Sequence, residues 1–81
     1  MTLREQIVLV TRRYCAVTGM SQARLSTIIL GGGHRLATIA NGRGDLNTGT
    51  FEKAMAWLSL NWPADADWPD GVDRPQSEAA E

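Results

Sequence analysis

The sequence predicts an all-α fold of four short helices, followed by an acidic segment that contains tryptophan and proline. Within residues 1–61, apolar residues recur at intervals of three and four, which is the spacing that places them on one face of an α-helix. Residues suited to capping lie at the ends of these stretches. No stretch alternates polar and apolar residues over the length of a strand, so a sheet or a β-wing is not expected.

The first helix is expected to run from Leu3 to about Val17. Thr2-Leu3-Arg4-Glu5 has the form of a capping box, in which the Thr hydroxyl and the Glu carboxylate each satisfy a backbone donor of the other residue. Gly19 is placed to end the helix. The apolar stripe of this helix, which we expect to brace the domain, consists of Leu3, Ile7, Val10, Tyr14 and Val17.

Residues 21–42, SQARLSTIILGGGHRLATIANG, predict two short helices joined by a glycine turn. Ser21 can cap the first, which begins at Gln22, and Gly31 lies where a left-handed cap would end it. The apolar positions of that helix are Leu25, Ile28 and Ile29. The second helix begins near His34 and stops at Asn41-Gly42, with an inner face of Leu36, Ile39 and Ala40. This leaves an outward face of His34, Arg35, Thr38 and Asn41.

The fourth helix is expected to be capped by Asn47, Thr48 or Thr50 and to end near Asn61. Its end follows from Pro63, which cannot continue a helix and disfavours helical geometry at the preceding residue. Its apolar positions are Phe51, Ala54, Met55, Trp57 and Leu58.

Length and composition exclude several classes of function. Eighty-one residues form one small domain with a thin core, so a large active-site cleft is not expected. The one cysteine, Cys15, cannot form an internal disulfide, and it lies on a different predicted helix from the one histidine, His34. We therefore expect no metal, no cofactor and no enzymatic activity.

The apolar runs are too short to span a membrane and no secretory signal is visible, which predicts a cytoplasmic protein.

Charge is distributed unevenly along the chain. Residues 1–60 hold seven basic and three acidic residues, a net charge of +4, whereas residues 61–81 hold one arginine and six acidic residues, a net charge of −5. The overall value of −1 therefore conceals a basic body. Because neutralising phosphates supplies most of the non-specific affinity for DNA, this local charge favours a nucleic-acid partner.

The stretch from Ser21 to Gly42 resembles the helix-turn-helix of phage repressor and Cro-like regulators. Ser26 fits the small-residue position of that motif, and its buried apolar positions fall on Leu25, Ile29, Leu36 and Ile39. Two positions depart from the pattern, because Leu30 stands where the turn glycine is expected and Gly31 where an aliphatic residue is expected. The resemblance covers about a quarter of the chain. Two helices with a glycine link also occur in small helical domains that do not bind DNA.

The resemblance implies a small bacterial or phage regulator, a repressor that binds double-stranded DNA as a homodimer. Residues 1–61 would form the DNA-binding domain, with the third helix in the major groove. The expected base contacts are Arg35, Thr38, Asn41 and His34. The expected contacts to the sugar-phosphate backbone are Gln22, Arg24, Thr27, Gly33 and Arg43. The expected dimer interface is formed by Phe51, Met55, Trp57, Leu58, Trp62 and Trp68.

Residues 62–81, WPADADWPDGVDRPQSEAAE, contain all three prolines and too few aliphatic residues to form a core of their own. We expect this tail to be extended or partly disordered. Its two Trp-Pro pairs leave two alternatives open, because an indole has a large apolar surface to bury. Either the tail folds back so that one or both of Trp62 and Trp68 cover the first and fourth helices, or Trp68 and its acidic neighbours dock on a partner or a second subunit.

Two other functional classes remain open at this stage. The first is a protein-interaction module, such as a phage-encoded adaptor or inhibitor, that docks through the Trp-rich acidic tail and uses the helices as a scaffold. The second is an RNA-binding or assembly protein that uses the basic body without reading a groove. It is less favoured because few aromatic residues outside the tail are available to stack on bases.

Overall fold

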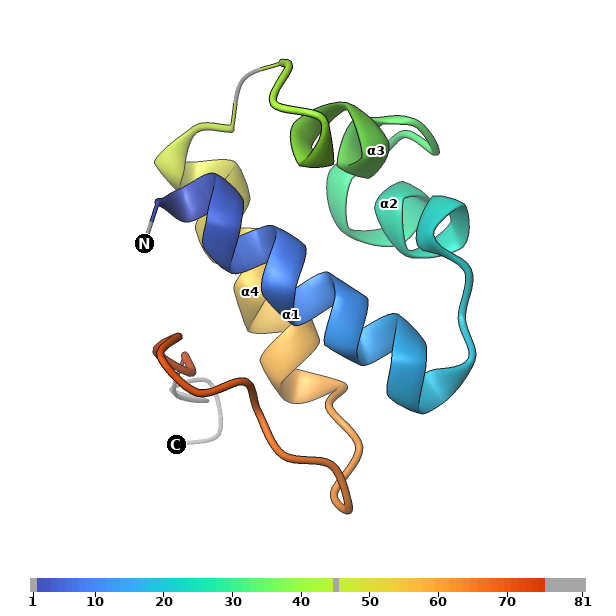
Figure 1. The fold of residues 1–81 in the computed structure, drawn as a ribbon, viewed down its shortest axis with the longest axis vertical. Helices are drawn as coiled ribbons and strands as arrows, with labels where there is room; N and C mark the ends of the chain where they lie inside the picture. The colour runs from blue at the N-terminus through green and yellow to red at the C-terminus, as the bar shows by residue number, and fades with distance from the viewer. Residues whose placement is uncertain (1, 45, 76–81) are drawn as a thin grey trace.

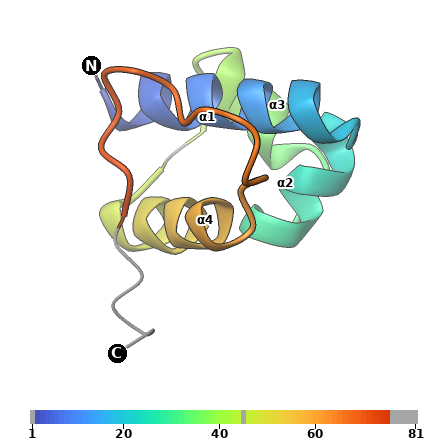
Figure 2. The same cartoon turned by 90° about the horizontal axis from the view of Figure 1, so that it is seen from below.

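The computed structural model describes residues 2–44 and 46–75 and confirms the all-α prediction for this part of the chain. It contains α1 (Leu3–Thr18), α2 (Gln22–Leu30), α3 (Arg35–Ala40) and α4 (Thr48–Leu60), and no strand among the described residues. α1 and α4 lie side by side and run in the same general direction, and α2 and α3 pack together beside them (Figures 1 and 2).

The helix ends are set by the local signals that the sequence contains. Thr2 and Glu5 form both hydrogen bonds of the capping box, and Ser21 accepts a hydrogen bond from the Arg24 amide. Gly19 and Gly31 end α1 and α2 in the left-handed conformation, each with φ of 78°, which glycine adopts without steric cost. Among the three candidate caps of α4, Asn47 is the one that accepts from a backbone amide.

The core lies where the four helices meet. It is built from Ile7, Val10, Tyr14, Leu25, Leu30, Leu36, Ile39, Ala54, Met55, Leu58, Trp62 and Val72. Three residues expected on inner faces are exposed instead, namely Val17, Ile28 and Ala40. α2 buries a stripe through Leu25, Ser26 and Leu30, and Ile28 lies to the side of it. In the six-residue α3 only Leu36 and Ile39 reach the core.

The chain after α4 folds back, as in the first of the two alternatives for the Trp-Pro pairs. We call residues 62–75 the Trp segment. Trp62 packs on Tyr14 of α1 with 5.8 Å between ring centroids, and Trp68 packs on Trp62 at 4.8 Å. The segment forms turns that cross α1 and α4 (Figure 2). The rest of the predicted tail, residues 76–81, lies outside the described residues.

Each indole also closes a short loop of its own segment. The Trp62 Nε1–H donates to the Ala66 carbonyl at 3.0 Å, and the Trp68 Nε1–H donates to the Val72 carbonyl at 2.9 Å. The guanidinium of Arg74 lies 5.3 Å from the Trp68 ring centroid and donates two hydrogen bonds to Ser59 of α4. These contacts fix the segment to the helices, although it has no regular secondary structure.

Candidate nucleic-acid interface

A buried hydroxyl fixes the start of α3. Ser26 is fully buried in α2, and its Oγ donates to the Gly32 carbonyl and accepts from the Leu36 amide at 2.9 Å. The residue at the N-cap position, His34, makes no side-chain capping bond. The first turn of a helix has amides without intrahelical partners, and here Ser26 satisfies one of them from a neighbouring helix. The small-residue position therefore caps α3 as well as allowing α2 and α3 to pack closely.

The two positions that depart from the helix-turn-helix pattern exchange roles in the structure. Leu30 is buried at the end of α2 and supplies the aliphatic contact one residue early. Gly31 adopts the left-handed conformation and makes the turn one residue late. The turn is thus displaced by one residue along the chain, and both the apolar contact and the glycine turn are present.

The end of α3 is held by Arg4. The sequence predicted no specific role for this residue, which lies between the capping residues Thr2 and Glu5 and counts among the basic residues of the chain. Its Nη1 donates to the carbonyls of Ile39 and Arg43 at 3.0 and 2.9 Å, and its Nη2 donates to the Gly44 carbonyl at 3.1 Å. The available signal was its spacing of three residues from the buried Ile7, which places Arg4 on the inner side of α1.

The predicted base-contacting residues lie on the free surface of α3 and at its ends. His34, Arg35 and Asn41 are exposed, whereas Thr38 is half-buried. The Thr38 hydroxyl donates to the His34 carbonyl at 2.9 Å, and its methyl packs against Gly44, where an added Cβ would come within 3.1 Å of it. His34, Arg35 and Thr38 line one shallow depression of about 150 Å³, and Asn41 lies at the opposite end of the helix. We call these four residues the α3 face.

The predicted backbone-contacting residues are distributed around α3. Gln22 and Arg24 are exposed in the first turn of α2, and Arg43 is exposed after α3. Thr27 is exposed, and its hydroxyl donates to the Ala23 carbonyl. Gly33 is half-buried, and an added Cβ would lie 3.5 Å from the Thr27 hydroxyl, an ordinary contact. Packing therefore does not require glycine at position 33.

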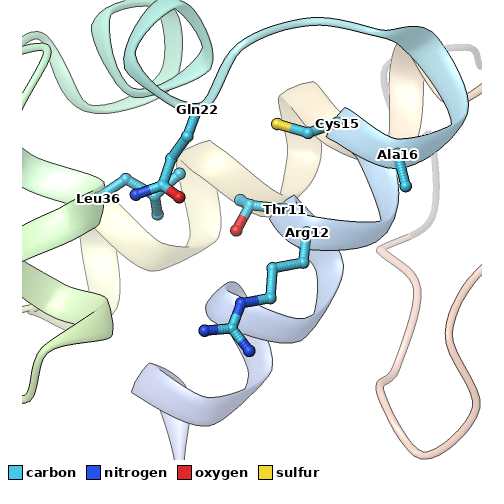
Figure 3. A pocket seen from close by; sticks show the side chains of 6 residues that line it. All are labelled: Thr11, Arg12, Cys15, Ala16, Gln22 and Leu36. Carbon is cyan, nitrogen blue, oxygen red and sulfur yellow. The ribbon is translucent and has the colours of Figure 1, made fainter.

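Most arginines of the helical body are free to bind an anion. Within residues 2–44 and 46–75, the guanidinium groups without an ion pair or hydrogen bond belong to Arg12, Arg13, Arg24, Arg35 and Arg43. Arg12 borders a groove of about 330 Å³ between α1 and the α2–α3 pair, with Gln22 and Leu36 on the opposite side (Figure 3). Arg13 instead shares a depression with Asp67 and Asp70 of the Trp segment.

The acidic residues of the Trp segment lie away from α3 in space as well as in sequence. Asp65, Asp67, Asp70 and Asp73 are exposed on the Trp segment. This segment lies at the lower end of the molecule in Figure 1, with α3 at the upper end. The α3 face is therefore not covered by the described part of the acidic tail.

The predicted dimer interface requires a correction. Met55, Leu58 and Trp62 are buried inside the single chain, at 1, 0 and 7 % exposure, and do not form a surface for a second copy. The Trp segment folds over α1 and α4, so these side chains serve the core. The other members of the predicted interface, Phe51, Trp57 and Trp68, are half-buried.

Other kinds of site find no support in the described part of the chain. Residues 2–44 and 46–75 contain no group of three or more His, Cys, Asp or Glu that could hold a metal ion. Burial raises the pKa of the Cys15 thiol, which favours the unreactive protonated form. No helix in the described residues is long and apolar enough to cross a membrane. No family model matches the chain, and neither curated proteins nor solved structures give a significant match.

Proposed function

We propose that this protein is a sequence-specific regulator of transcription that binds double-stranded DNA with α3 in the major groove. The observation that carries the proposal is the presentation of α3. Ser26 and Arg4 hold the two ends of this helix from inside, while Arg35 and Asn41 remain exposed. A short helix braced in this way has the geometry needed to enter a groove.

The residue types on the α3 face suit base recognition. The Arg35 guanidinium can donate two hydrogen bonds to guanine O6 and N7, and the Asn41 amide can pair with adenine N6 and N7. His34 and Thr38 can contact a phosphate or the methyl group of thymine. The surrounding residues Gln22, Arg24, Thr27, Gly33 and Arg43 would contact the sugar-phosphate backbone. About four phosphate contacts per subunit give a salt dependence of log K on log [salt] of roughly −3 to −4.

A homodimer acting in the cytoplasm as a repressor completes the proposal. One six-residue helix reads few base pairs, and two copies on an inverted repeat extend the recognised sequence. The two α3 helices would then lie about one helical turn, or ~34 Å, apart. Sedimentation equilibrium with and without operator DNA measures this stoichiometry. One protein chain per selected operator would rule out the dimer.

The experiment that tests DNA recognition is selection from a random duplex pool, followed by titration of the selected duplex and a scrambled duplex at several salt concentrations. Arg35→Ala should cost about 1–3 kcal/mol of binding free energy and relax the preference at one base pair. Arg24→Ala should weaken both duplexes equally. Arg13→Ala is the matched control, because Arg13 is an exposed, unpaired arginine that lies beside the Trp segment. Equal affinity of the wild-type protein for both duplexes would refute the proposal.

The interaction-module alternative depends on indoles that are available to a partner. The structure buries Trp62 and stacks Trp68 on it, with both indole N–H groups bonded inside the segment. The side chains of the segment that remain exposed are mainly acidic, and we therefore do not put this alternative forward as a second function.

A further inference from the structure

α3 is too short to define its own position. It has six residues, and helices shorter than about 12–15 residues are marginal when isolated in water. Leu36 and Ile39 fix its inner side, and Ser26 fixes its start. The direction in which its last turn and the following residues point therefore depends on what holds the carbonyl end.

The guanidinium of Arg4 is the group that holds this end. It spans three carbonyls, those of Ile39, Arg43 and Gly44, at 2.9 to 3.1 Å. These carbonyls lie on both sides of Asn41 along the chain and include that of Arg43 itself. Asn41 and Arg43 are proposed DNA contacts, so the segment that Arg4 restrains is also one that must meet DNA in a defined orientation.

We propose that Arg4 is a positioning residue for DNA recognition, which orients Asn41 and Arg43 by holding residues 39–44 and does not itself contact DNA. This inference rests on the proposed function. Arg4 comes from the first turn of α1, where it is half-buried, and both of its terminal nitrogens already donate to carbonyls.

Arginine is required for this role because of its shape. A planar fork of donors can reach several carbonyls at once, whereas a lysine ammonium is a compact charge at the end of a flexible stem. A cation at the carbonyl end of α3 is also favourable for the helix dipole. Arg4→Lys retains the charge and loses the fork, which makes it the informative substitution. Arg4→Met removes the charge and keeps an unbranched apolar stem.

The test compares Arg4→Lys with the wild-type protein on the selected and scrambled duplexes, at a temperature where circular dichroism shows both proteins fully folded. We expect the affinity of Arg4→Lys for the selected duplex to fall about tenfold, within the range for one misplaced base contact. Its affinity for the scrambled duplex should stay within about twofold and its salt slope should be unchanged. Arg24→Ala, a direct phosphate contact by our proposal, should instead reduce the salt slope by about one per subunit.

A double-mutant cycle separates positioning from a general effect on folding. If Arg4 acts through Asn41, then Asn41→Ala should weaken the selected duplex less in the Arg4→Lys background than in the wild type. Additive losses would overturn the proposal, and so would an unchanged affinity of Arg4→Lys. A salt slope lowered by about one in both Arg4→Lys and Arg4→Met would show that Arg4 contacts phosphate directly and would also overturn it.

Hydrogen exchange without DNA distinguishes failure of this inference from failure of the proposed function. Loss of the fork should speed exchange of the amides of residues 41–43, which donate to carbonyls of α3, more than that of the α4 amides. If the wild-type protein shows no preference for any duplex, the proposed function is wrong, and the proposed positioning role of Arg4 is then wrong as well. If the protein recognises DNA and these amides exchange at the wild-type rate in Arg4→Lys, Arg4 does not hold the segment and only this inference is wrong.

Discussion

α3 and the Trp segment are both too short to keep a shape alone, and the protein anchors them by opposite means. α3 buries two apolar side chains and is held mainly through its backbone, by the Ser26 hydroxyl and the Arg4 guanidinium. The Trp segment is held through its side chains, by the indole of Trp62 packed on Tyr14 and the indole of Trp68 packed on Trp62. The anchoring of each element decides which of its groups remain free for a partner.

The two surfaces that result differ in charge and in chemistry. Because its backbone is the part that is held, α3 leaves Arg35 and Asn41 exposed, and these side chains can read base edges. Because its large side chains face inward, the Trp segment exposes mainly carboxylates. The surface with the exposed Arg35 and Asn41 and the surface with the carboxylates thus lie at opposite ends of the molecule (Figure 1).

The largest expected effect comes from breaking the aromatic anchor. Trp62→Ala should reduce the free energy of unfolding by about 3–5 kcal/mol, the usual cost of removing a buried Trp side chain, because it removes the ring between Tyr14 and Trp68. Urea denaturation measures this loss. Trp68→Ala, at the half-buried end of the stack, should cost less. A loss below about 1 kcal/mol for Trp62→Ala would show that the stack does not anchor the segment.

The second effect comes from the polar anchor of α3. Ser26→Ala should cost about 2–3 kcal/mol, because it leaves the Leu36 amide and the Gly32 carbonyl without the buried hydroxyl. Thr27→Ala is the matched control, since the Thr27 hydroxyl is exposed and bonded within its own helix, and it should change stability by less than about 0.5 kcal/mol. Equal denaturation midpoints for the two variants would mean that the hydroxyl of Ser26 is not needed to fix α3.

How well each region could be predicted from the sequence depends on how far apart along the chain the residues that determine it lie. The caps Thr2 and Ser21 and the glycine ends of α1 and α2 were predicted correctly because a few neighbouring residues decide them. For α4 the sequence offered three candidate caps, and the structure selects Asn47. The role of Arg4 was missed because its partners lie 35 to 40 residues away. The burial of Trp62 could be posed only as an alternative, since it depends on Tyr14 in another helix.

A smaller effect distinguishes two glycines of the α2–α3 turn. Gly31→Ala should cost about 1–2 kcal/mol, because Gly31 has φ of 78° and side chains are strained in that conformation. Gly33→Ala should leave stability close to that of the wild type, because the added Cβ makes only ordinary contacts. Thermal unfolding of the two variants compares them directly. Equal destabilisation would show that the left-handed conformation of Gly31 does not distinguish the two positions.

The smallest effect is a dependence of stability on pH. As the pH falls, the end of α3 should loosen at a higher pH than the Trp segment does. Hydrogen bonds from Thr2, chiefly from its backbone N–H, lower the pKa of the Glu5 carboxyl below its ordinary value. A carboxyl whose pKa is lower in the folded state stabilises that state above the unfolded pKa, and the contribution is lost as pH falls through the folded pKa. Glu5 caps the turn of α1 that carries Arg4, so acid should loosen the support of residues 39–44.

Hydrogen exchange and near-ultraviolet circular dichroism, followed from pH 6 to pH 3, test this order. The amides of residues 41–43 should lose protection at a higher pH than the aromatic signal of the Trp stack, because indoles do not titrate. Glu5→Gln should show the weaker protection already at pH 6, and its difference from the wild type should vanish in acid. Simultaneous loss of both signals in the wild type would mean that the two regions share one anchor.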